Sequence, residues 1–218
     1  MAGFFLQHRP RRLPVLFLLD TSEQMQGTFQ VTMQDGLQVV KSQLQQHIAE
    51  SQNIYLGGVT FGEQAITHRL VPLDIFEPPT WQAQGACHLK PALLSLTETL
   101  LFDLIAARPG HPGDYSPLVF FILGNTPGDV WQERLTELRA VTDNRRPLII
   151  VLVTRPELVN SMRAISEHVL LLKSAEAAYM TYFFFWVARS IAKIYEDSEH
   201  GTTAIDFPEL PYGVVIPR

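Results

Sequence analysis

The apolar run from Leu13 to Leu19 constrains the fold of this chain more than any other stretch. Its sequence, LPVLFLL, shows no alternation with polar residues, and it stops abruptly at Asp20, where a polar turn begins. A short, continuous apolar run bounded by turn residues is typical of a strand buried on both faces of a sheet. Asp20 is therefore expected at the carboxyl end of a central strand, the edge where open α/β sheets place their ligand sites.

Further apolar strands and helical stretches alternate along the chain. Residues 117–123 and 147–153 repeat the buried-strand pattern, and a more polar strand at 67–76 suits an edge of the sheet. Other strands are expected at 54–61 and 168–172. Helices are expected at 89–106, 156–165 and 175–195, around an apolar stripe that runs from Met33 to Ile48, and in a segment that ends near 141. Such alternation implies right-handed βαβ crossovers. We predict a single doubly wound α/β domain over 1–206, with a mainly parallel central sheet, helices on both faces and one antiparallel edge strand, followed by an extended, proline-containing tail at 207–218.

Composition narrows the class of protein. With 218 residues, 46% of them hydrophobic, the chain is large enough for one well-buried core. Its net charge of −5 gives no sign of the basic face that nucleic-acid binders carry, so we expect no nucleic-acid partner. The single cysteine excludes an intramolecular disulfide. The sequence shows no secretory signal and no apolar run near the ~20 residues of a membrane span, so we expect a cytoplasmic protein.

The residues that follow the first strand resemble a known metal site. DTSEQ at 20–24 resembles the D-x-S-x-S metal-ion-dependent adhesion site of von Willebrand factor A domains. PLVFFILGNTPGDVW at 117–131, FFFWVARSI at 183–191 and the ending FPELPYGVVI resemble the bacterial tellurium-resistance TerY type within that superfamily. The resemblance covers nearly the whole chain. It implies the von Willebrand factor A fold and a site that holds an acidic group of a partner protein through a divalent cation.

Three of the five ligand positions implied by this resemblance have changed. The family supplies an aspartate and two serines from its first loop, a threonine from the second and an aspartate from the third. Asp20 and Ser22 remain, but Gln24 replaces the second serine, Cys87 stands at the threonine and Asn125 at the second aspartate. Mg²⁺ prefers hard oxygen ligands in a tight octahedron, and a thiol is a poor ligand for it. We therefore predict a degenerate site without metal or cofactor; Mg²⁺ held by Asp20 and Ser22 is the less favoured interpretation.

The resemblance also implies a function. Such a chain would be a non-catalytic protein-binding or scaffold module of a bacterial stress-response or defence system, acting with partners such as a protein kinase and a phosphatase. Partner recognition is expected in a crevice at the carboxyl edge of the sheet, formed by Asp20, Ser22, Gln24, Cys87, His88 and Asn125. Two alternatives stay open: a phosphohydrolase-like enzyme that uses Asp20, and a metal-dependent adhesion module with a modified site.

Enzymatic functions lack the residues that they need. Aspartyl-phosphate enzymes require a D-x-D pair, but Ser22 stands at the second position, and Thr154 and Arg155 stand where a strand-end lysine is expected. Cys87 and His88 invite comparison with Cys–His nucleophile pairs, yet sequence neighbours rarely face each other. We expect no catalytic residue.

Other clusters have structural interpretations. Three arginines precede the first strand, and we interpret them as solvated: Arg9, Arg11 and Arg12. Thr126 or Asp129 is placed to cap the helix that ends near 141. The aromatic residues of 179–186 are interpreted as core packing, with a protein interface as the alternative for part of them.

Overall fold

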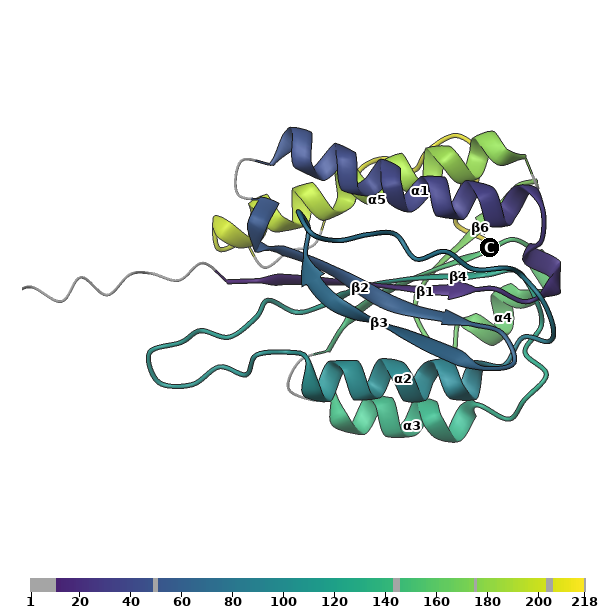
Figure 1. Ribbon diagram of the computed structural model, residues 1–218, viewed down its shortest axis with the longest axis horizontal. Helices are drawn as coiled ribbons and strands as arrows, with labels where there is room; N and C mark the ends of the chain where they lie inside the picture. The colour runs from purple at the N-terminus through teal and green to yellow at the C-terminus, as the bar shows by residue number, and fades with distance from the viewer. Residues whose placement is uncertain (1–10, 49–50, 143–145, 175, 203–205, 218) are drawn as a thin grey trace, which may run out of the picture.

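The computed structural model describes residues 11–48, 51–142, 146–174, 176–202 and 206–217. Within these residues, a seven-stranded sheet has the order β3-β2-β1-β4-β5-β6-β7 and carries helices on both faces (Figure 1). The strands are β1 (Leu13–Asp20), β2 (Ile54–Phe61), β3 (Ala65–Pro72), β4 (Leu118–Leu123), β5 (Leu148–Val153), β6 (His168–Leu172) and β7 (Val214–Val215). The five central strands, in the order β2-β1-β4-β5-β6, pair in parallel with their neighbours. The predicted doubly wound α/β fold is confirmed.

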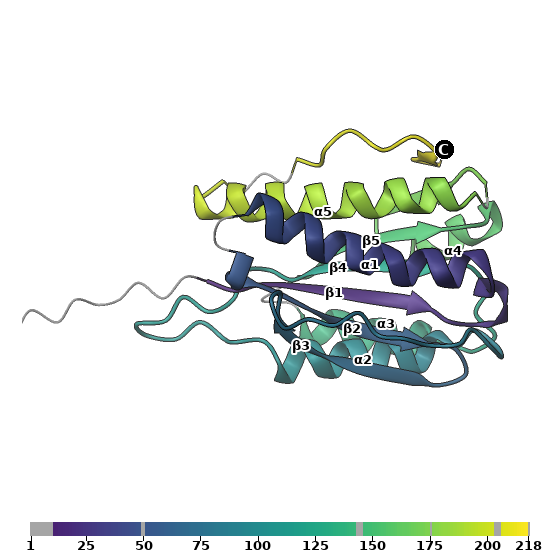
Figure 2. The ribbon, with the colours of Figure 1, turned by 45° about the horizontal axis from the view of Figure 1, so that its top comes forward.

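Two helical layers cover the sheet. One face carries α1 (Thr28–His47) and α5 (Ala177–Glu199), which lie side by side (Figures 1 and 2). The other face carries α2 (Leu89–Phe102), α3 (Gln132–Val141) and the short α4 (Val159–Met162). Single 3-10 turns are η1 (Glu23–Met25), η2 (Ser51–Asn53) and η3 (Pro156–Leu158). Gly36 lets α1 approach α5 closely, because a Cβ there would lie 2.1 Å from the Phe184 ring.

β1 is central because both of its faces are covered. All eight of its residues are buried, and it pairs in parallel with β2 and β4. Val15 and Phe17 pack into the layer of α1 and α5, whereas Leu16 and Leu18 pack into the layer of α2 and α3. The alternation of strand side chains between faces thus supplies apolar residues to two cores at once, which explains why the run contains no polar residue.

Two of the predicted elements end earlier than expected. The strand predicted at 67–76 is β3, which ends at Pro72, and the helix predicted to 106 is α2, which ends at Phe102. The chain then leaves α2 for a long loop that projects beyond the amino ends of the strands (Figure 1). Among the described residues, no helix has the length and apolarity needed to cross a membrane.

The tail runs back along α5 and ends at the edge of the sheet (Figure 2). Trp186 Nε1 donates to the Pro208 carbonyl (3.0 Å), and the Trp186 and Phe207 rings lie 5.7 Å apart. Further on, Val214 and Val215 pair antiparallel with β6 as β7. The predicted antiparallel edge strand is β3; the tail adds a second, because its extended backbone pairs with the otherwise open edge of β6.

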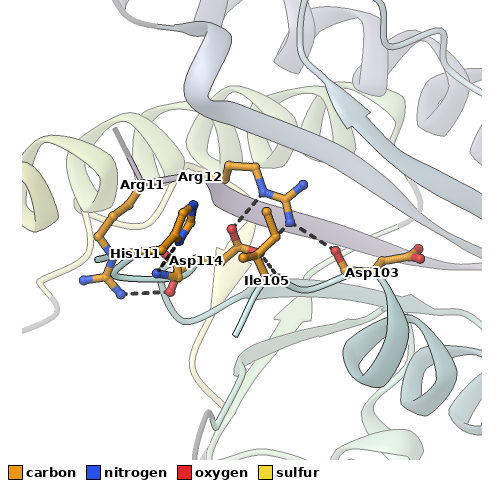
Figure 3. Close-up of polar contacts among 7 residues, drawn as sticks. Arg11, Arg12, Asp103, Ile105, His111 and Asp114 are labelled. Carbon is orange, nitrogen blue, oxygen red and sulfur yellow. Dashed lines mark hydrogen bonds and ion pairs between the residues drawn. The ribbon is translucent and has the colours of Figure 1, made fainter. Parts of the chain in front are cut away.

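The projecting loop is fastened to the start of β1 by a buried ion pair (Figure 3). Arg12 Nε and Nη2 donate to Asp114 Oδ1 and Oδ2 (2.8 and 2.6 Å), and Nη2 also donates to the Asp103 carbonyl (3.1 Å). The Ile105 amide donates to Asp114 Oδ2 (2.7 Å), and the Arg12 guanidinium lies 4.6 Å from the Tyr55 ring centroid. The hydrogen bonds to Asp114, ahead of the opposing effect of burial, raise the pKa of Arg12.

The interpretation of these arginines as solvated is wrong for two of them. Arg12 is clamped as described, and Arg11 donates to the Asp114 carbonyl (2.8 Å) and lies 4.2 Å from the Tyr115 ring centroid. Their partners lie about a hundred residues away along the chain, so a local sequence pattern does not predict these contacts. Arg9 lies outside the described residues.

Candidate functional site

Three loops meet at the carboxyl edge of the sheet, at the right of Figure 1. The Glu23 amide in the loop after β1 donates to the Gly85 carbonyl in the loop before α2 (3.0 Å). The Gly128 amide in the loop after β4 donates to the Cys87 carbonyl (2.9 Å). We call this region the carboxyl-edge site; its loops are residues 20–27, 84–88 and 124–131, which contain all six residues predicted for partner recognition.

Asp20 is the centre of the carboxyl-edge site and is fully buried. Its Oδ1 accepts the Ser22 amide (2.8 Å), and its Oδ2 accepts the amides of Gly124 and Asn125 (2.9 and 3.0 Å). Burial raises the pKa of Asp20, and these hydrogen bonds offset part of that effect because they favour the ionised form. The carboxylate thereby ties the loop after β1 to the loop after β4.

Ser22 and Met25 complete the floor of the site. Both are fully buried. The Ser22 hydroxyl lies near enough to Asp20 to lower the pKa of that carboxyl, but it makes no hydrogen bond of standard geometry with the described residues. The Met25 thioether lies against Gly124, where a Cβ would come within 2.0 Å of the sulfur. Any larger residue at 124 would therefore force the Met25 side chain to move.

Cys87 lies beneath the surface, close to two carboxylates. Its side chain is 1% exposed. Burial first, and then the negative charges of Asp20 and Asp129, raise the pKa of the Cys87 thiol far above its ordinary value. Cys87 is therefore a thiol rather than a thiolate. His88 is the residue before α2, and its ring lies beside Gly128, 3.8 Å from where a Cβ would be.

Asp129 contacts a different helix from the one predicted. Thr126 or Asp129 was predicted to cap the helix that ends near 141, which is α3, but the cap position of α3 is Trp131. The Asp129 carboxylate instead accepts the amides of Leu89 and Lys90 (2.9 and 2.6 Å) at the start of α2. Negative charge is favourable at a helix N-terminus. The carboxylate thus fixes the loop after β4 against α2.

Arg155 is a residue of this region that the search for partner-binding residues missed. It lies two residues after the end of β5, and its Nη2 donates to Asn125 Oδ1 (3.2 Å), which also accepts the Thr126 amide (2.8 Å). The Thr126 hydroxyl lies 3.5 Å from the same Nη2. A signal was available, because Arg155 is a charged residue in the turn that follows a buried strand, one position further along than Asp20 is after its own apolar run.

The predicted residues are only partly brought together. Asp20, Ser22, Cys87 and Asn125 cluster in the floor and wall of the site, and His88 lies at its rim, whereas Gln24 is exposed and makes no side-chain hydrogen bond to the described residues. No three histidine, cysteine, aspartate or glutamate side chains in the described part of the chain are grouped as metal ligands would be.

Comparison with known proteins identifies the fold through solved structures. No family model and no curated protein matches the sequence. The pilus adhesin SpaC from Lactobacillus rhamnosus GG superposes with a TM-score of 0.66 at 11% identity, over 87% of this chain and 31% of SpaC. A von Willebrand factor type A protein from Catenulispora acidiphila superposes with a TM-score of 0.59 at 10% identity, over 83% of this chain and 42% of that one. The chain has the von Willebrand factor A fold.

The same fold occurs in a protein with an occupied metal site. Proximal thread matrix protein 1 from the mussel byssus, solved with a zinc-occupied MIDAS motif, superposes with a TM-score of 0.56 at 14% identity, over 82% of this chain and 48% of that one. This chain thus spans about a third to a half of the length of these three structures. Likeness at such low identity concerns the von Willebrand factor A fold alone.

Proposed function

We propose that this chain is a non-catalytic protein-binding module that recognises its partner at the carboxyl-edge site without a divalent cation. The observation that carries the proposal is the state of Asp20, whose two oxygens accept three backbone amides inside the protein. The residue that would anchor a cation instead braces the loops. Resemblance of 117–131 and 183–191 to the TerY type supports a finer proposal: a scaffold in a bacterial cytoplasmic stress-response or defence system, acting with a kinase and a phosphatase.

The remaining donors do not fit Mg²⁺, which requires hard oxygens in a near-octahedral arrangement. Gln24 is exposed, and the Cys87 thiol is buried and protonated. Asn125 offers a neutral amide oxygen that already accepts two hydrogen bonds, one of them from the Arg155 guanidinium. A cation so close to the site opposes the binding of a second cation. This donor set is what supports recognition without metal.

Burial supports the absence of catalysis. Asp20 has no exposed surface and both of its oxygens accept backbone amides, so it is poorly placed to attack a phosphate ester. Cys87 is buried with a raised pKa, which removes the thiolate that a nucleophile needs. The phosphohydrolase alternative is therefore less favoured than a binding function.

The groups around the site suit direct contact with a protein. Gln24, Thr126 and Gly128 are exposed, and Val130 is 71% exposed beside them in the loop after β4. Amides and hydroxyls both donate and accept hydrogen bonds, and they can be buried at an interface without desolvating a charge. The exposed tail residues Tyr212 and Ile216 form the competing surface.

Copurification tests the proposal. The tagged full chain is used to capture proteins from its host in EDTA and in Mg²⁺, alongside the double variant Gln24→Ala with Asn125→Ala. We expect the same partner in both buffers and at least about fivefold weaker capture by the double variant, which corresponds to about 1 kcal/mol. Gln46→Ala, an exposed change at the other end of α1, is the control.

Two outcomes would contradict the proposal. Capture that requires Mg²⁺ would support the metal-dependent adhesion module, particularly if Mg²⁺ also raised the melting temperature of the wild type by several degrees but not that of Asp20→Ala. Capture that survives the double variant and is lost in Tyr212→Ala with Ile216→Ala would place the partner on the tail.

A further inference from the structure

We propose that Arg155 is the built-in cation of the carboxyl-edge site and that it receives the carboxylate of an aspartate or glutamate side chain of the partner protein. This inference rests on the proposed function and names the chemistry of the partner.

Arg155 is held in place by backbone structure on both sides. The amide of the preceding residue, Thr154, donates to the Leu123 carbonyl at the end of β4 (3.1 Å), and η3 begins directly after Arg155. From there the side chain reaches across to the loop after β4, where it meets Asn125. The backbone amide of the same Asn125 is bonded to Asp20 Oδ2 (3.0 Å), so Asn125 connects the guanidinium to the buried carboxylate.

The contacts of the guanidinium leave much of its donor capacity unused. Nη2 donates to two neutral acceptors, Asn125 Oδ1 at 3.2 Å and the Thr126 hydroxyl at 3.5 Å. Nη1 donates to none of the described residues. Nε is buried and lies 3.3 Å from Glu157 Oε1, but without the alignment of a hydrogen bond. A guanidinium has five N–H donors, so this one is far from saturated.

The nearby ion pair is weak enough to be exchanged. The side chains of Arg155 and Glu157 are 36% and 57% exposed. Exposed pairs contribute little to stability because water and salt screen them. A partner protein that covers Arg155 excludes water and lowers the effective dielectric constant around it. The attraction between Arg155 and a carboxylate of that partner would therefore be stronger than the exposed pair with Glu157.

Charge in the surrounding loops favours a carboxylate over a phosphate. In the described loops that follow β1, β4 and β5, Arg155 is the single lysine or arginine. Glu23, Asp129 and Glu157 lie in the same loops and add negative charge. One guanidinium matches one carboxylate fork, whereas a doubly charged phosphate would need further cations against these three acids.

A titration with a minimal probe tests the inference. The ¹⁵N-labelled full chain is titrated in EDTA with N-acetyl-aspartate N-methylamide and, separately, with the corresponding asparagine compound. We expect saturable shifts of the Asn125 and Thr126 amides with the aspartate probe, with a Kd on the order of 10 mM for a single contact. The asparagine probe should give no saturable shift, because it lacks the charge.

Variants separate the role of the charge from general perturbation. Arg155→Gln should weaken binding of the aspartate probe at least fivefold, and Arg155→Lys should weaken it less, because the lysine keeps the charge but loses the fork of donors that matches a carboxylate. Arg108→Gln is the control, since Arg108 is exposed on the projecting loop at the amino edge; it should bind as the wild type does. Unchanged binding by Arg155→Gln, or equal binding of the asparagine probe, would overturn the inference.

The result can be read separately from the copurification experiment. Tighter binding of inorganic phosphate than of the aspartate probe would assign Arg155 to a phosphorylated ligand and also overturn the inference. Neither result would affect the proposed protein-binding function, which depends on capture by the Gln24 and Asn125 surface. Binding of the aspartate probe that appears only when the EDTA is replaced by Mg²⁺ would contradict both.

Discussion

The two ends of the sheet each contain a buried aspartate that fixes a loop, but the two aspartates are neutralised differently. At the amino edge, Asp114 is held by the paired hydrogen bonds of Arg12. At the carboxyl edge, Asp20 is held by three backbone amides and no cation. Amides supply partial charges only, so burial still raises the pKa of Asp20.

The arginines at the two ends differ in the complementary way. Arg12 contacts the Asp114 carboxylate, the Asp103 carbonyl and the Tyr55 ring, and its side chain is only 20% exposed. Arg155 meets the neutral oxygen of Asn125 and a weakly aligned Glu157. Arg12 is therefore structural, because it is bonded to the buried Asp114 carboxylate. Arg155 remains available for a ligand, because its hydrogen-bond acceptors are uncharged.

Removal of the Asp20 carboxylate should have the largest effect. In Asp20→Ala, three amides lose their acceptor. Each buried donor left unsatisfied costs about 1–3 kcal/mol, so we expect urea denaturation to show a loss of about 4 kcal/mol. Ser22→Ala is the control, because its hydroxyl makes no standard hydrogen bond with the described residues; it should cost less than about 1 kcal/mol. A similar small loss for both variants would mean that the loops are held without the carboxylate.

Removal of Asp114 should cost slightly less. Asp114→Ala leaves Arg12 without its ion-pair partner and the Ile105 amide without an acceptor. Loss of one partner of a fully buried pair costs about 3–5 kcal/mol, and the partial exposure of Arg12 reduces this to about 3 kcal/mol. Asp103→Ala is the control, because Asp103 contacts Arg12 through its carbonyl only. Equal effects of the two changes would show that the ion pair does not fasten the loop.

Much of this framework is readable from local sequence. The apolar runs predicted β1, β4 and β5, because a strand buried on both faces leaves no place for a polar residue. Asp20 was placed at the carboxyl edge for the same reason. The hydrophobic pattern thus predicts where each strand lies and which polar residue first follows it.

Partners of side chains across the fold are not readable in this way. Asp129 caps a helix that begins 40 residues earlier, and Arg12 pairs with a residue 102 positions away. Arg155 meets Asn125 only because β4 and β5 are neighbours in the sheet. The edge strand β7 likewise exists because the tail meets β6. Each of these depends on how distant segments pack, which local periodicity does not specify.

Restoring the metal ligands should reveal the effect of Arg155. In the triple variant Gln24→Ser, Cys87→Thr and Asn125→Asp, the new carboxylate would face the Arg155 guanidinium and pair with it. We expect calorimetry to show Mg²⁺ binding about tenfold tighter, or about 1.4 kcal/mol, when Arg155→Gln is added. The triple variant alone is the reference. Equal affinity in the two would place Arg155 too far from the metal position to act as its replacement.

The raised pKa of Asp20 predicts a specific pH dependence. Its folded-state value lies above that of the unfolded chain, so the folded state binds more protons in the acid range between the two values. The stability that Asp20 contributes is complete below the unfolded pKa, near 3.9, and falls as pH rises towards the folded pKa, by at most about 1.4 kcal/mol per pH unit. The difference in unfolding free energy between wild type and Asp20→Ala should therefore narrow over this range. A difference that widens would mean that the amides outweigh burial.

The smallest effect is expected from the change that tests the comparison most directly. Arg155→Gln removes an exposed pair with Glu157 and one hydrogen bond to an amide, so unfolding free energy should change by less than about 0.5 kcal/mol. Arg12→Gln, the same substitution at the other end, leaves Asp114 buried without its cation and should cost about 2 kcal/mol or more. Parallel urea titrations of the two variants measure the difference. If Arg155→Gln proved as destabilising as Arg12→Gln, both guanidiniums would be structural, and Arg155 would not be available to a partner.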